Sequence, residues 1–161
     1  MTTVLEATRE LDESVGRYLV CRVGNRRCAL PIEHVVETMR VLPYEPLATA
    51  PDFVVGVSII RGRAVPVVDV ARLLGSTASS AGRLVTLMIE NRVVALAVDE
   101  VTGVAPMDDG SVHELPPLLE VATGAVIESL GVLDSELLVV LRESRLVPES
   151  VWSLVHATGS D

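Results

Sequence analysis

The sequence predicts a mainly β protein made of two tandem copies of one small unit, each with about five strands. Nearly half of the 161 residues are apolar, yet only one Phe, two Tyr and one Trp occur, so the core must consist of Val, Leu, Ile and Ala. Short apolar runs alternate with turn residues at the spacing that is typical of barrels and sandwiches. Two blocks of sequence also recur in the same order, which indicates an internal repeat.

The first repeated block is a predicted β-hairpin. Tyr18–Val36 aligns without gaps on Leu84–Thr102, at a shift of 66 positions. Each copy contains an apolar run, a turn that carries Asn-Arg, and a second apolar run, and this pattern is typical of a hairpin.

The second repeated block follows the first in both copies. Val57–Leu74 matches Leu130–Val147 at a shift of 73 positions. Any two Val-rich hairpins look alike, but two matched blocks in the same order favour a true repeat. The apolar runs are continuous rather than alternating, so we expect many strands to be covered on both faces, as in two barrels packed together.

The repeat divides the chain into two halves, at about residues 17–75 and 83–147, and strands are free to cross between them. The connection Gly75–Gly82 is small and polar, which is typical of a flexible surface segment.

The two ends of the chain flank these halves. Residues 1–16 are predicted to be an arm that is either disordered or a short helix, because Thr3-Val4-Leu5-Glu6 fits a capping box. Residues 148–161 are predicted to be a docking helix and tail, since Val151, Leu154 and Val155 share a helical face after Pro148.

Composition excludes several functions. The formal net charge is -9 and the sequence contains no Lys, which argues against a binder of nucleic acid and removes the phosphate-binding loop of nucleotide hydrolases. The apolar runs are too short to span a bilayer, and the amino terminus does not resemble a secretory signal. We therefore expect a cytoplasmic protein that is not inserted into a membrane.

No group of residues predicts catalysis. Ser58 lies in an apolar run without the closing glycine of a nucleophile elbow, so we interpret it as a strand residue. The three histidines are scattered singly, which favours neither a metal site nor a cofactor site. Cys21 and Cys28 are most simply two small buried apolar residues, although cross-strand pairing in the first hairpin would also bring them close. We expect no enzyme activity and no cofactor.

One stretch of the sequence is distinctive, and further motifs lie in order around it. The stretch is Gly56–Val70, which contains Ile60-Arg61-Gly62 and Val65-Pro66-Val67-Val68-Asp69 and leads into Leu73-Leu74-Gly75. The other motifs are Leu30-Pro31-Ile32, Arg92–Val101 and Glu128–Leu133. Together they resemble the signature of the CheW family, and the resemblance extends from about Tyr18 to Val147. It implies two intertwined five-stranded SH3-like β-barrels with short helices.

The resemblance also implies a function and a set of contact residues. A CheW-like protein is a non-catalytic adaptor that couples the cytoplasmic tip of a chemoreceptor to the regulatory domain of a CheA-type histidine kinase, and it is a monomer when isolated. The positions that match a receptor-binding groove between the barrels are Val36, Glu37, Arg61 and Val104, with Glu37 as the expected ion-pair partner of Arg61. The positions that match a kinase contact are Phe53, Gly56 and Val57.

Two other functions fit the sequence. The family commonly has Asn where this chain has Ile59, and an aromatic residue near the position of Cys21. Because of these two departures, one alternative is a CheW-like adaptor of another chemosensory pathway, which would control surface motility, development or gene expression. A different class is a small β-barrel ligand carrier or enzyme, which would need a deep polar pocket with converging titratable groups.

Overall fold

The structure is a computed structural model that describes residues 15–75, 81–108, 112–114, 127–133, 136–142 and 146–159. Residues 1–14 of the predicted arm and residues 76–80 of the predicted connection lie outside this part of the chain. The strands are β1 (Val15–Val23), β2 (Arg26–Pro31), β3 (Val35–Arg40), β4 (Val54–Ile60), β5 (Arg63–Asp69), β6 (Arg83–Ile89), β7 (Arg92–Val98), β8 (Glu100–Asp108), β9 (Val112–Glu114), β10 (Ile127–Leu133) and β11 (Glu136–Leu141). The helices are η1 (Ile32–His34), α2 (Val70–Leu73) and α4 (Glu149–Gly159).

Both copies of the first repeated block are antiparallel hairpins, β1–β2 and β6–β7. Each hairpin turns through residues with positive φ, which are Gly24 at 61° in the first, and Glu90 at 49° and Asn91 at 68° in the second. Gly and Asn adopt this backbone conformation at little cost, which explains why they lie between the two apolar runs of each hairpin.

The strands form two sheets, and each sheet takes strands from both copies of the repeat. One sheet has the order β8-β1-β2-β11-β10-β9 and the other has the order β3-β6-β7-β5-β4. The first hairpin of each copy therefore pairs with the later strands of the other copy, and the predicted intertwined two-barrel fold is confirmed. The sheet that contains β1 has a sixth strand, because the three residues of β9 pair with β10.

The two sheets repeat each other residue by residue. When residue numbers are shifted by 66 or 73 positions, the parallel strand pair of one sheet becomes the parallel strand pair of the other. The same is true of the pair that joins the first strand of each hairpin to an edge strand. The matched pairs are Val67↔Ala95 with Val140↔Ala29, and Val35↔Leu87 with Val101↔Cys21. A β-bulge also recurs, at Val36 in β3 and 66 positions later at Thr102 in β8.

The largest core cluster lies between the sheets rather than inside either barrel. It contains residues of β1 and β2 from one sheet, residues of β4 to β7 from the other, and the buried face of α4. Two smaller clusters fill the barrel interiors, one around Leu84 and Val67 and the other around Ala29 and Leu138. The expectation that many strands are covered on both faces is therefore confirmed.

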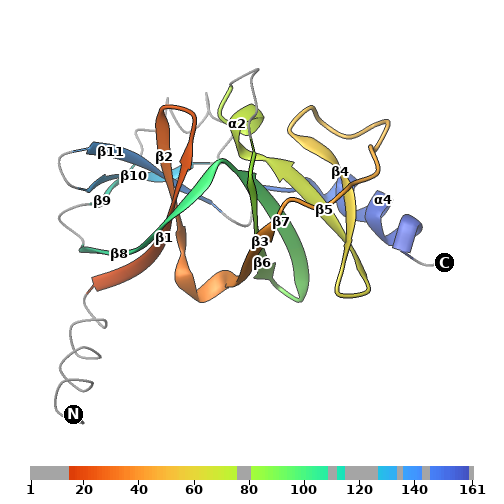
Figure 1. Ribbon diagram of the computed structural model, residues 1–161, viewed down its shortest axis with the longest axis horizontal. Coiled ribbons are helices and arrows are strands. Elements are labelled where there is room, and N and C mark those ends of the chain that lie inside the picture. Colours follow the sequence, from red (N-terminus) through yellow and green to blue (C-terminus); the bar gives the residue numbers. More distant parts are fainter. Residues whose placement is uncertain are drawn as a thin grey trace, which may run out of the picture.

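Helix α4 joins the two halves of the molecule. It follows β11 of the six-stranded sheet, but it packs against β5 of the five-stranded sheet, where Figure 1 shows it at the right beyond β4 and β5. Its buried residues Val151, Trp152 and Val155 belong to the core between the sheets. Among the described residues, no helix has the length and apolar character needed to cross a membrane.

Candidate functional site

Glu37 and Arg61 form a two-point ion pair on the five-stranded sheet. Arg61 Nε donates to Glu37 Oε1 at 3.0 Å, and Arg61 Nη2 donates to Glu37 Oε2 at 2.8 Å. Glu37 is in β3, and Arg61 lies in the turn between β4 and β5 with φ at 51°, followed by Gly62 at 77°. The positive φ values allow a tight two-residue turn, which holds the guanidinium over β3.

This pair connects the two edge strands of its sheet, since β3 and β4 stand at opposite ends of the strand order. The segment before β4 assists the same closure, because Glu45 and Val57 exchange backbone hydrogen bonds at 2.8 Å. Ser58 is buried and donates its hydroxyl to the carbonyl of Pro43 at 2.7 Å, so it is a strand residue, as expected. The pair thus lies where the sheet curls into a barrel.

The electrostatics of the pair are reciprocal. The hydrogen bonds and positive charge of Arg61 hold the pKa of Glu37 below its ordinary value, and Glu37 raises the pKa of Arg61. The Arg61 side chain is 76% exposed and that of Glu37 is 28% exposed, so the guanidinium faces solvent while the carboxylate lies closer to the sheet. This geometry leaves one face of Arg61 open to a partner.

The two aliphatic groove candidates are exposed. Val36 is 53% exposed at the bulge of β3, and Val104 is 50% exposed on β8, the edge strand of the other sheet. Ile59 and Met88 are also exposed, at 66% and 42%, and sequence reasoning missed them. Their apolar runs are continuous and do not show which members face outward, and for Ile59 the Asn that the family commonly has at this position was the available signal of exposure.

The three kinase-contact candidates lie in or just before β4. Phe53 is partly buried against the core between the sheets, and Val57 is 4% exposed. Gly56 lies under the preceding segment, where an added Cβ would clash with the Glu45 carbonyl oxygen. Gly56 and Val57 therefore shape this strand edge from within rather than offering side chains at the surface.

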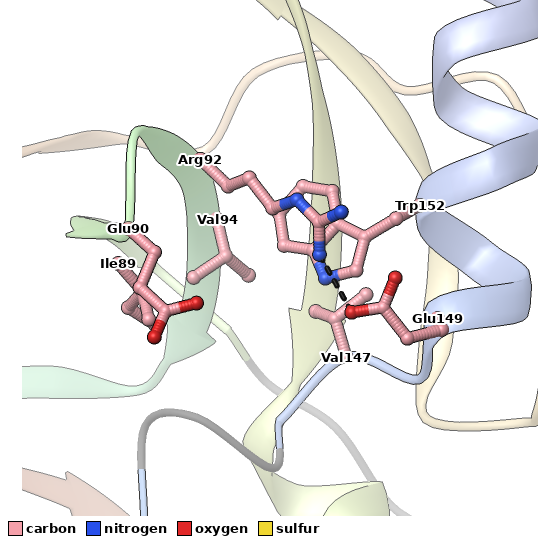
Figure 2. A pocket seen from close by; sticks show the side chains of 7 residues that line it. All are labelled: Ile89, Glu90, Arg92, Val94, Val147, Glu149 and Trp152. Carbon is pink, nitrogen blue, oxygen red and sulfur yellow. Dashed lines mark hydrogen bonds and ion pairs between the residues drawn. The ribbon is translucent and has the colours of Figure 1, made fainter.

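A small hollow lies where α4 meets the β6–β7 hairpin, and we name it the Arg92 hollow (Figure 2). Its volume is about 50 Å³, and Ile89, Val94 and Val147 line it with apolar atoms. Arg92 Nη1 donates to Glu149 Oε1 at 2.7 Å, and the guanidinium carbon lies 5.1 Å from the centre of the Trp152 ring. The hydrogen bond to Glu149 raises the pKa of Arg92.

A second hollow of about 250 Å³ lies between the β1–β2 turn and the end of α2, and we name it the Arg26 hollow. Val23, Ala71 and Leu74 supply its apolar lining. Arg26 Nη1 donates to the Leu74 carbonyl at 2.9 Å across one side.

Cys21 and Cys28 are free thiols that face each other across the β1–β2 ladder. Both are fully buried in the core between the sheets. A hydrogen bond with Cys21 and burial together hold the pKa of Cys28 well above its ordinary value. Cys21 and Cys28 are therefore two small residues buried among apolar side chains, as the sequence predicts.

The candidate receptor-site residues are thus divided between the two barrels: Glu37, Arg61 and Val36 lie together on the five-stranded sheet, and Val104 lies on an edge strand of the six-stranded sheet. Within the described ranges, no three residues among His, Cys, Asp and Glu come together as metal ligands would. Exposed aliphatic side chains next to an oriented ion pair suit an interface with another protein. The class that fold and site define is therefore a two-barrel protein scaffold.

Comparison with known proteins gives the family. The model of the CheW-like domain matches residues 17–151, and the chain belongs to the CheW family. As a member, it is a CheW-like scaffold of chemotaxis signalling.

Individual relatives agree with this assignment. The chain is 25% identical over 159 residues to the chemotaxis protein CheW of Klebsiella aerogenes, which covers 96% of each protein. It is 31% identical over 107 residues to CheW of Rhizobium meliloti, covering 64% of this chain and 69% of that protein. It is 33% identical over 101 residues to protein FrzA of Myxococcus xanthus, covering 61% of this chain and 62% of that protein.

A solved structure has the same fold. The scaffolding protein TtCheW of Thermoanaerobacter tengcongensis superposes with a TM-score of 0.70 at 23% identity, covering 80% of this chain and 89% of that one.

Proposed function

We propose that this protein couples the cytoplasmic tip of a chemoreceptor to the regulatory domain of a CheA-type histidine kinase, as a cytoplasmic adaptor in receptor arrays beneath the inner membrane. The observation that carries the proposal is the Glu37–Arg61 pair with exposed Val36 on the same strand, β3, together with exposed Val104 on the edge strand of the other sheet. An amphipathic receptor helix needs an aliphatic wall and few, well-oriented polar groups. Val36 and Val104 supply such walls, and Arg61 supplies an oriented donor.

The kinase contact is proposed for the edge of β4. Phe53 is only partly buried and offers a surface there, whereas Gly56 and Val57 act by holding the strand and the segment around Glu45 in place. A related β-barrel domain would pack against such an edge through side chains and strand backbone. Isolated protein is expected to be a monomer that assembles only with these partners.

The test is direct binding with purified components from the same organism. The wild-type chain, Arg61→Ala and Arg40→Ala are titrated against a receptor signalling-tip fragment and, separately, against the kinase regulatory domain. Arg61→Ala should weaken receptor binding at least about tenfold, with an unchanged circular dichroism spectrum. Arg40, an exposed arginine also in β3, is the matched control and should bind as wild type.

One outcome would reject the coupling role, and another would reject the proposed receptor site. Wild-type protein that binds neither partner would remove the coupling role, and the alternative of a β-barrel ligand carrier or enzyme would then be tested first. Receptor affinity that is unchanged in Arg61→Ala would remove Arg61 and Glu37 from the receptor site.

A second candidate is a scaffold of a chemosensory pathway that does not control swimming. The similarity to FrzA supports it, because FrzA matches this chain at 33% identity over 101 residues and CheW of Rhizobium meliloti at 31% over 107 residues. Deletion of the gene separates the two: loss of swimming towards attractants favours the first candidate, and intact swimming with altered surface movement favours the second.

A further inference from the structure

The Arg26 hollow and the Arg92 hollow occupy equivalent places in the two copies of the repeat. Arg26 and Arg92 are 66 positions apart, and each begins the second strand of its hairpin. Leu74 and Val147 are 73 positions apart, and each lies shortly after the last strand of its copy. The same arginine and the same apolar wall are therefore built twice.

The two hollows differ in what occupies them. At the Arg92 hollow, α4 places a carboxylate on the guanidinium and an aromatic ring over it, as Figure 2 shows for Glu149 and Trp152, and about 50 Å³ remains. At the Arg26 hollow about 250 Å³ remains. In the part of the chain that the structure describes, the Arg26 guanidinium donates a hydrogen bond to the Leu74 carbonyl, and no carboxylate forms an ion pair with it.

The Arg26 hollow has the chemistry that its counterpart uses to hold a helix. Val23 and Ala71 are each 5% exposed and present apolar atoms at its base. Arg26 is exposed, and a guanidinium binds a carboxylate and stacks on an aromatic ring at the same time. An acidic residue and an aromatic residue three positions apart lie on one face of a helix, as Glu149 and Trp152 do.

We propose that the Arg26 hollow is a docking site for a helix of a partner protein that carries an acidic residue one turn before an aromatic residue. The helix would place its carboxylate on Arg26 and its ring against Val23 and Leu74. A second copy of this chain does not supply that helix, because Trp152 is 8% exposed and Glu149 already pairs with Arg92. Docking here is independent of the coupling to a receptor and kinase proposed above.

The chain itself provides the probe. A blocked synthetic peptide with the sequence of residues 148–159 is titrated into isotope-labelled full-length protein, and amide signals are followed by NMR. We expect saturable shifts at Gly24, Asn25 and Gly75, with a dissociation constant below about 1 mM. Arg26→Gln should weaken binding at least about tenfold, because the carboxylate loses its charged partner. The affinity of Arg26→Lys for the peptide should lie between those of wild type and Arg26→Gln.

Matched controls distinguish binding at the Arg26 hollow from nonspecific binding of the peptide. Arg40→Gln in the protein should leave the affinity unchanged, whereas Glu149→Gln or Trp152→Ala in the peptide should lower it. No shifts up to about 1 mM peptide would overturn the proposal. Shifts at Arg92 and the Trp152 indole instead would mean exchange with the chain's own helix and would overturn it as well, as would equal binding to wild type and Arg26→Gln.

Discussion

Single residues have their roles because of the strand positions on which they fall. Glu37 follows a bulge in β3, and Arg61 lies in a turn with positive φ, so two side chains 24 positions apart meet in a two-point ion pair. The family motif in the sequence predicts this partnership. It did not predict that the pair bridges the two edges of a sheet, because strand order was not readable from the chain.

The Glu37 carboxylate should titrate below the ordinary range for a glutamate. Arg61 lowers its pKa from the ordinary 4.5, so the contribution of the pair to stability is complete above that value and is lost as the pH falls through the lower, folded-state pKa. An NMR titration of the Glu37 carboxyl carbon measures this shift directly. In Arg61→Ala the pKa should rise, and equal pKa values in both proteins would contradict the expected pairing in solution.

Cys28 should tolerate replacement by valine. The repeat places Val94 at the equivalent position, opposite Leu87 just as Cys28 is opposite Cys21. Cys28→Val should therefore change the free energy of unfolding by less than about 1.5 kcal/mol in urea denaturation. Cys28→Thr has the same shape with a buried hydroxyl and should cost about 1–3 kcal/mol more. Equal stability of the two variants would argue against a purely apolar environment.

At the scale of elements, the exchanged hairpins and the crossing helix hold the molecule together. The β1–β2 hairpin leaves its own copy to pair with β11 and β8, and β6–β7 does the reverse. Helix α4 then returns from the six-stranded sheet to pack against β5. The apolar runs around Asn-containing turns predict the two hairpins. Which strands lie next to each hairpin in its sheet is known only from the tertiary structure.

Trp152 should contribute strongly to the docking of α4. It is 8% exposed, it packs in the core between the sheets, and its ring faces Arg92 at 5.1 Å. Trp152→Ala should reduce the free energy of unfolding by about 3–5 kcal/mol in chemical denaturation. Ser153→Ala, on the exposed face of the same helix, should change it by less than about 0.5 kcal/mol. Similar values for both variants would show that α4 is not docked in solution.

At the scale of the whole molecule, the largest core lies between the barrels, so neither barrel is an independent folding unit. Each half of the sequence contains only part of each sheet. The division at residues 75–83 is therefore a division of the sequence repeat, and its place as a domain boundary stays a prediction.

Separate halves of the chain should not fold. Fragments 15–75 and 81–159 each lack strands that complete both sheets, so neither should give a cooperative thermal transition by circular dichroism. The intact chain should unfold in one transition, with Trp152 fluorescence and circular dichroism coinciding, because α4 and both sheets share a core. A fragment that melts cooperatively alone would contradict this dependence.

The sequence by itself determined the mainly β class, the repeated hairpins and the family, because turn residues, aliphatic runs and ordered motifs are local along the chain. It also identified Glu37, Arg61, Val36 and Val104 as candidates. Only the tertiary structure decided that Val57 is buried while Ile59 is exposed, which strands each exchanged hairpin pairs with, and that two equivalent hollows are filled differently. Those properties depend on which distant strand or helix covers each face, and a continuous apolar run contains no record of that pairing.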